Sequence, residues 1–303
     1  MDDMPRGSAT LSFTEDELVN FKKKSQIAEI WRRMRKNKLA MVGLGIFIVI
    51  VLCTTFADVI VPYETGIIQV MEERMMPPGG GHIFGTDMYG RDIFARIIHG
   101  TRYSFVMGVF AVLVGISAGG VLGAVAGYYG GIVDTVIMRV VDTVSCIPFM
   151  LLSLTIVSAL GPGLINVLLA LMIAMVPNYT RVIRSAILTV ANMDFIEAAR
   201  ACGTPNRAIV FKHVLPNAIG TVIVQATMSV GGTIIAAAGM SFIGMGIQPP
   251  APEWGSMLSE GREYMRYSPF IVLFPGLAIA MSALSLNLMG DGLRDALDPR
   301  LKD

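Results

Sequence analysis

Five long stretches of this 303-residue sequence contain no Asp, Glu, Lys or Arg: 39–57, 103–133, 143–180, 214–252 and 267–290. A helix of about 20 apolar residues crosses the hydrocarbon core of a bilayer, so each stretch can hold at least one span. The stretch 143–180 is long enough for two, and Gly161-Pro162-Gly163 at its centre predicts a tight hairpin between them. The sequence therefore predicts an all-α, polytopic membrane protein with six transmembrane helices, at about 39–60, 103–127, 143–160, 164–180, 217–239 and 268–289.

The basic residues are unevenly distributed between the connections of these spans. One alternate set carries nine, one, five and three Lys and Arg, and the other set carries four, none and two. Because basic residues favour the cytoplasmic face, the first set, with both termini and the loop at about 190–215, is predicted to be cytoplasmic. Residues 1–38 are then a cytoplasmic basic tail, and residues 39–303 form the transmembrane domain.

The basic tail also contains an amphipathic pattern. Its apolar residues recur at helical spacing opposite the charges: Ile27, Ile30, Trp31 and Met34. This pattern predicts an interfacial amphipathic helix. Thr14 and Glu17 have the spacing of a capping box, either for this helix or for a separate short one. The alternative is a basic tail whose only role is to set the orientation of the first span.

Several kinds of chemistry are not indicated. The formal net charge of +1 gives no basic field for nucleic acid. The cysteines and histidines fit no spacing typical of a disulfide framework or a metal site: Cys53, Cys146, Cys202, His82, His99 and His213. No Gly-x-x-x-x-Gly-Lys-Ser/Thr motif occurs, so the phosphate cradle of a nucleotide-binding domain is not expected. We predict no catalytic residue, no metal, no cofactor on this chain and no nucleic-acid partner.

Glycines repeat every four residues along the second predicted span: Gly115, Gly119, Gly123, Gly127 and Gly131. On a helix with 3.6 residues per turn they form one slowly rotating ridge without side chains. Close packing of small residues drives helix association in lipid, so we expect a second helix to pack against this ridge. The alternative is a substrate-binding surface.

The loop between the fourth and fifth spans has the chemistry of a helix, a sharp turn and a second helix. Helix-forming residues run from Phe195 to Cys202, and Gly203 is suited to the left-handed conformation that ends a helix. Thr204 is positioned to cap a second helix with Pro205 at its first position. The first helix has few bulky side chains, a shape that suits docking in a partner groove, although an ordinary cytoplasmic loop is the alternative.

Specific residues of this loop resemble a known family. Glu197-Ala198-Ala199, followed by Gly203, Ile209 and Leu215-Pro216, is similar to the EAA loop of bacterial ABC importer permeases. The stretches 82–92 and 290–299 resemble signatures of the dipeptide, oligopeptide and nickel importer permeases, specifically of the second of their two membrane subunits. The resemblance implies a type I importer permease fold, with a coupling helix at Glu197, Ala198, Ala199 and Gly203 that contacts the ATPase.

The stretch 82–92 also allows an interpretation from its residues alone. Thr86 is placed as a helix cap, and Asp87–Arg91 and Asp92–Arg96 form acidic–basic pairs at i, i+4. The apolar residues that follow share one side of a helix: Ile93, Phe94, Ile97 and Ile98. This pattern predicts a short helix on the external surface leading into the second span. The alternative is that Arg91 and Asp92 contact a docked binding protein.

The resemblance implies a function and a set of partners. The chain would form half of the translocation pathway of an ATP-driven importer in a bacterial or archaeal cell (inner) membrane. Its partners would be a second homologous permease, two ATPase subunits that bind ATP and Mg, a solute-binding protein and membrane lipid. Peptides are the expected cargo, with nickel or another small solute as the alternative. An ion-coupled secondary transporter is the rival class. Such carriers place ionisable residues near the bilayer midplane, and the predicted spans hold none there.

Overall fold

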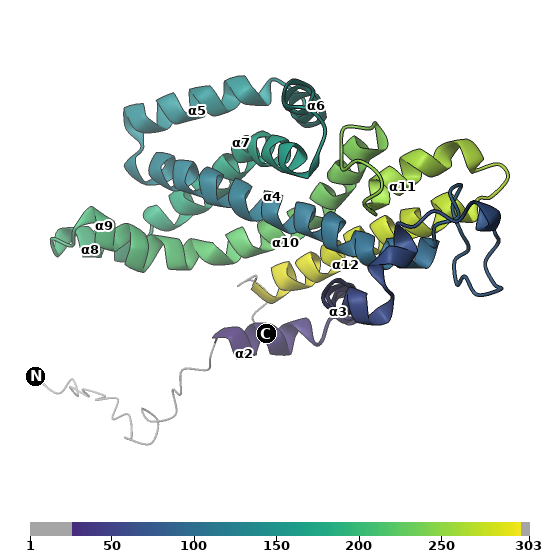
Figure 1. Ribbon diagram of the computed structural model, residues 1–303. Helices are drawn as coiled ribbons and strands as arrows, with labels where there is room; N and C mark the ends of the chain where they lie inside the picture. Colours follow the sequence, from purple (N-terminus) through teal and green to yellow (C-terminus); the bar gives the residue numbers. More distant parts are fainter. Residues whose placement is uncertain (1–25, 298–303) are drawn as a thin grey trace, which may run out of the picture.

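The computed structural model describes residues 26–297, which form a bundle of long helices (Figure 1). The helices are α2 (Gln26–Met34), α3 (Lys38–Ile60), α4 (Ile93–Tyr129), α5 (Gly131–Ser145), α6 (Phe149–Leu160), α7 (Leu164–Ala191), α8 (Asp194–Ala201), α9 (Asn206–Ile209), α10 (Leu215–Phe242), α11 (Trp254–Gly261) and α12 (Phe270–Leu297). Short 3-10 helices lie at η1 (Tyr63–Gly66), η2 (Met71–Glu73) and η4 (Arg262–Tyr264), and a π-helical segment, η3 (Val210–Val214), joins α9 to α10.

Within the described residues, five helices are long and apolar enough to cross a membrane, and a bent pair, α5 with α6, can supply a sixth crossing. The five are α3, α4, α7, α12 and the rod of α9, η3 and α10. In the bundle, α4 packs along α7, α10 lies against α12 and α4, and α12 lies against α3 (Figure 1). Large apolar side chains stay exposed on α3, as Val59 does at 83%, which suits a helix whose outer face meets lipid.

The prediction of one continuous helix at 143–160 is wrong. α5 ends at Ser145 and α6 begins at Phe149, with a bend of 81° between them. Pro148 lacks the N–H that a helix interior needs, and it disfavours helical backbone at the residue before it, so the helix breaks here. The 12 residues of α6 are too few to span a bilayer alone. The predicted hairpin at 161–163 is confirmed, because α6 ends just before it and α7 begins just after it.

The short helix predicted to begin at Thr86 begins later. Residues 82–92 form turns and isolated bridges, whereas the predicted helical residues from Ile93 onward form the start of α4. The hydroxyl of Thr86 does not cap a helix but donates to the carbonyl oxygen of Glu73. Asp92 is the N-cap of α4, and its Oδ1 accepts a hydrogen bond from the Ala95 N–H at 2.8 Å. α4 therefore begins earlier than the predicted second span.

The predicted amphipathic helix is present as α2, which packs against α12. Met34 is buried in a small apolar cluster with Ala40 and Ala296, while Trp31 remains 44% exposed. The capping box predicted from Thr14 and Glu17 lies outside the described residues.

α12 extends to Leu297, past the predicted end of the sixth span. A Cβ on Gly290 would lie 2.6 Å from the Cγ of Met228 on α10, and one on Gly292 would overlap Ala40 of α3. The two glycines thus allow α12 to approach both neighbours closely.

Candidate functional site

The loop at 194–214 forms the helix–turn–helix that its residues predict. α8 ends at Ala201, and Gly203 has a φ of +76°, in the left-handed region that favours glycine. The Gly203 N–H donates to the Arg200 carbonyl oxygen at 2.9 Å, and the Thr204 N–H donates to that of Ala199 at 3.1 Å. This pair of hydrogen bonds is a Schellman motif, which ends α8 at a defined residue. The expected cap at Thr204 is wrong, because Pro205 occupies the N-cap position of α9 without a side-chain hydrogen bond.

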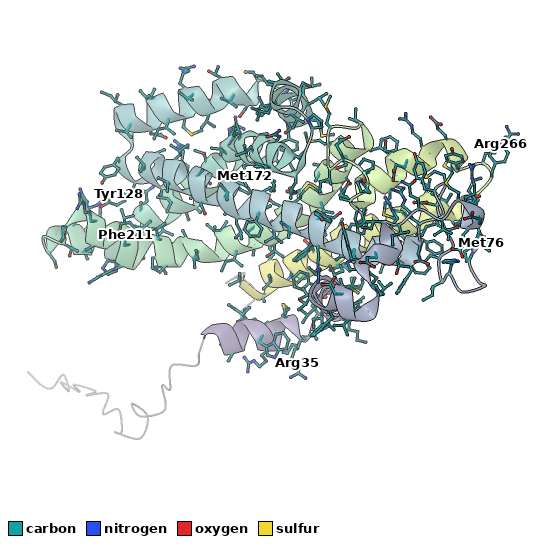
Figure 2. All side chains as sticks on the ribbon, viewed as in Figure 1. Arg35, Met76, Tyr128, Met172, Phe211 and Arg266 are labelled. Carbon is teal, nitrogen blue, oxygen red and sulfur yellow. The ribbon has the colours of Figure 1, made fainter. Side chains whose placement is uncertain are left out.

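Side-chain contacts hold this loop against the end of α4. The Tyr128 hydroxyl and the Asn206 Oδ1 are 2.8 Å apart, and the Arg200 guanidinium lies over the Tyr128 ring, 5.4 Å from its centroid. Figure 2 shows Tyr128 at the end of the bundle that carries α8 and α9. Ile196, on the inner face of α8, is fully buried. The loop is therefore docked on the bundle as one body.

The outer face of α8 presents the residues singled out from the sequence. Glu197, Ala198 and Gly203 are exposed, and Ala199 is partly buried against the core. Two aromatic side chains are exposed nearby, Phe195 at 43% and Phe211 at 70%. Exposed aromatic rings beside a helix face of small side chains are typical of a protein-binding surface.

The second helix of the loop continues into the membrane without a break. α9, η3 and α10 form one helical rod from Asn206 to Phe242. Pro216 lies directly after the π-helical segment η3, at the start of α10. A displacement of α8 would therefore be carried along the rod into the centre of the bundle.

The glycine ridge on α4 lies against α7 at four of its five positions. A Cβ added at Gly115 would lie 3.1 Å from the Tyr179 ring, and one at Gly119 would lie 2.7 Å from the Tyr179 Cβ. A Cβ at Gly123 would lie 2.6 Å from the Thr180 carbonyl oxygen, and one at Gly127 would lie 2.9 Å from the Arg184 carbonyl oxygen. The prediction is wrong for Gly131: it opens α5 after α4 has ended, and a Cβ there would meet nothing within 4 Å.

The opposite end of the bundle holds a cluster of buried ion pairs that was not predicted from the sequence. Arg91 pairs with Asp87 at 2.6 Å and with Glu260 at 2.9 Å, and Arg96 pairs with the same oxygen of Glu260 at 2.9 Å. Both arginines are 1% exposed. Arg91 is thus occupied within the chain and is not on the surface for a docked partner. The i, i+4 spacing of Asp87 and Arg91 was the available signal, but Glu260 is far away in the sequence.

Glu253 is another buried acid near this end. Its carboxylate caps α11, accepting hydrogen bonds from the N–H groups of Gly255 at 2.9 Å and Ser256 at 2.8 Å, and the Ser104 hydroxyl of α4 lies 3.3 Å away. Burial raises the pKa of the Glu253 carboxyl, and the hydrogen bonds to the backbone lower it in part. Glu253 therefore ties α11 to α4.

A bundle of membrane-spanning helices, with an exposed helix–turn–helix continuous with one of them, is the arrangement expected of the importer permeases that the loop resembles. Residues 119–303 match the family described as binding-protein-dependent transport system inner membrane component, and residues 25–78 match the N-terminal TM domain of oligopeptide transport permease C. The chain belongs to this family of multi-pass inner-membrane permease subunits, which confirms the resemblance found in its loop and signature stretches.

Curated relatives match along nearly the whole chain. The dipeptide transport system permease protein DppC of Alkalihalophilus pseudofirmus is 44% identical over 90% of each chain. The glutathione transport system permease protein GsiD of Pectobacterium atrosepticum is 40% identical over 97% of this chain and 96% of its own. The di/tripeptide transport system permease protein DppC of Pseudomonas aeruginosa is 41% identical over 92% of this chain and 94% of its own.

The fold is also found in a solved transporter. A structure of inward facing conformations of the MetNI methionine ABC transporter aligns with a TM-score of 0.52 and 21% identity, over 67% of this chain and 94% of that chain. At this identity the match concerns the fold alone, and the predicted ABC importer permease fold is confirmed.

Proposed function

We propose that this chain is the transmembrane permease subunit of an ATP-driven importer for dipeptides or short oligopeptides, forming half of the translocation pathway. The observation that carries the proposal is the exposed α8, with Glu197 and Ala198 on its surface and a continuous helical rod leading from it to Phe242. Relatives that transport dipeptides and glutathione, at 40–44% identity over most of the chain, support the peptide cargo.

In this function, ATP is hydrolysed by other subunits of the complex. Two ATPase subunits bind ATP and Mg, and the exposed face of α8 docks on one of them. A second homologous permease completes the pathway, and a solute-binding protein delivers peptide at the end of the bundle formed by loop 61–92. Both termini and α8 then lie in the cytoplasm, in keeping with the distribution of basic residues.

The mechanism follows from rigid-body motion. When the ATPase subunits close, they move α8, and the Schellman turn and the rod transmit this motion to α10. The Tyr128–Asn206 and Arg200–Tyr128 contacts make α4 move with the loop. The bundle would thereby alternate between two arrangements, open to one side of the membrane and then to the other.

The test is transport by the purified complex. We would co-express the chain with its partner permease, ATPase and binding-protein subunits, reconstitute the complex in liposomes and measure uptake of labelled dialanine, glutathione and nickel. Uptake of a peptide that requires both ATP and the binding protein is expected. Uptake of nickel and of neither peptide would show that the cargo is nickel. Uptake driven by an ion gradient without ATP would show that the chain is not part of an ATP-driven importer.

A further inference from the structure

A cleft of about 390 Å³ is lined by residues of the α5–α6 bend, α7 and α10. Figure 1 shows how these elements lie relative to one another. This volume lies within the range of about 300–1,000 Å³ typical of small-molecule sites. Phe149 and Met175 are among its apolar lining residues, whereas Asn178, Arg181 and Ser229 are polar. The cleft thus combines apolar surface with a few hydrogen-bonding groups, the usual composition of a ligand site.

One polar side chain of this cleft, Asn178, has no role in holding the fold together. The Asn178 side chain is exposed, and no hydrogen bond joins it to any part of the chain between residues 26 and 297. The preceding residue, Pro177, has no N–H to donate to the carbonyl oxygen of Ile173, so that acceptor lacks its usual helical donor. An unpartnered amide on a membrane-spanning helix is costly in lipid, which favours a water-filled or ligand-filled space around it.

The charged group of the cleft is accessible and weakly held. Arg181 contacts Asp142 of α5 at 3.1 Å, and their side chains are 43% and 58% exposed. Pairs this exposed contribute little stability, because water competes for both partners. Its neighbour one turn along α7, Arg184, is instead bound by two hydrogen bonds to Asp134, both 2.5 Å long. Arg181 is therefore free to exchange its partner, whereas Arg184 braces α5.

We propose that this cleft binds the peptide in transit, with Arg181 holding the α-carboxylate and Asn178 hydrogen-bonding to the peptide backbone. A planar guanidinium binds a carboxylate through two parallel hydrogen bonds, and every peptide carries that carboxylate whatever its side chains. Phe149 and the flexible Met175 would contact side chains without selecting strongly among them. This inference rests on the proposed function and names the group of the substrate that the permease recognises.

The test uses the assembled complex in liposomes with dialanine as the probe. We expect Arg181→Gln and Asn178→Leu each to lower dialanine uptake at least fivefold, while Arg181→Lys keeps part of it. Membrane abundance, co-purification with the ATPase and ATP hydrolysis stimulated by loaded binding protein should stay at the wild-type level. Arg139→Gln is the matched control, because Arg139 is an exposed arginine of α5 that does not line the cleft.

A second comparison shows whether Arg181 binds the peptide or only holds α5 against α7 through Asp142. Asp142→Asn should leave uptake intact, since it frees Arg181 for the peptide. If Asp142→Asn loses as much uptake as Arg181→Gln, and the double variant Arg181→Asp, Asp142→Arg restores uptake, the ion pair has only a structural role and the inference is wrong. Wild-type uptake in Arg181→Gln would also overturn it. A wild-type complex that assembles but transports no peptide would instead show that the proposed function has failed, and the inference with it.

Discussion

Arg96 of α4 and Glu260 of α11 form a buried ion pair, with 2.9 Å between Nη2 and Oε2 and 1% of the Arg96 side chain exposed. The same Glu260 oxygen also accepts from Arg91, so one carboxylate holds two guanidinium groups. Asp87 supplies the second negative charge, 2.6 Å from Arg91 and 3.7 Å from Arg96. The cluster fixes α11 and loop 61–92 to the start of α4.

Replacing Glu260 with Ala should strongly destabilise the protein. It leaves two buried guanidinium groups with Asp87 as their single acidic partner, and breaking a buried pair in this way costs about 3–5 kcal/mol. Thermal unfolding of the purified protein in detergent would measure the change. The control is Asp58→Ala, which removes an exposed partner of Arg102 and should leave the unfolding temperature almost unchanged. Equal unfolding temperatures for the two variants would show that the cluster is not important for stability.

Gly119→Leu and Gly123→Leu should impair folding or assembly of the complex. A side chain at either position would meet the α7 backbone or the base of a side chain within 2.6–2.7 Å and push the helices apart, at a cost of about 1–3 kcal/mol or more. Membrane abundance and co-purification with the partner subunits would measure the loss. Gly45→Leu on α3 is the control, because a Cβ there meets nothing within 4 Å. Normal assembly of both ridge variants would contradict close α4–α7 packing.

Gly203→Val should uncouple transport from ATP hydrolysis without removing the protein from the membrane. A β-branched residue resists the φ of +76° at this turn, at a cost of about 1–2 kcal/mol, so the angle between α8 and α9 should change. Gly203→Asn is the matched control, since Asn tolerates this conformation. Uptake and stimulated ATP hydrolysis are measured together, and wild-type uptake in Gly203→Val would remove the turn from the mechanism.

Glu197→Lys tests the exposed face of α8 separately. The side chain is exposed, so its reversal should not affect folding, but it should repel a basic group on the ATPase partner and weaken co-purification. Glu197→Gln, which keeps the shape and removes the charge, should have a smaller effect. Undiminished binding of the ATPase by Glu197→Lys would argue that the carboxylate is not part of the interface.

The topology can be tested independently of transport. Reporter fusions near Arg207, in α9 of the loop at 194–214, should give a cytoplasmic signal. Fusions near Gly80, in loop 61–92, should give an external one. The measurement compares an enzyme active only outside the cytoplasm with one active only inside. An external signal near Arg207 would overturn both the orientation and the proposed ATPase contact.

Local chemistry was sufficient to predict much of this molecule. The uncharged stretches predicted the long helices, and the 161–163 hairpin followed from Gly and Pro. The end of α8 followed from Gly203, because a left-handed residue after helix formers is a property of a few neighbouring residues. The EAA-like spacing and the signature stretches at 82–92 and 290–299 were sufficient to indicate the family.

Features that depend on residues distant in the sequence were decided by the tertiary structure. Asp87 and Arg91 suggested a surface helix because the sequence does not show that Glu260 lies beside them in a buried site. The break before Pro148 was not predicted, although the proline is a local signal for it. Its 81° bend and the cleft beneath it depend on how α5 and α6 pack over α7. Sequence periodicity determines which residues share a helix face, whereas only packing determines which face meets which neighbour, because a contact requires two segments to be positioned at once.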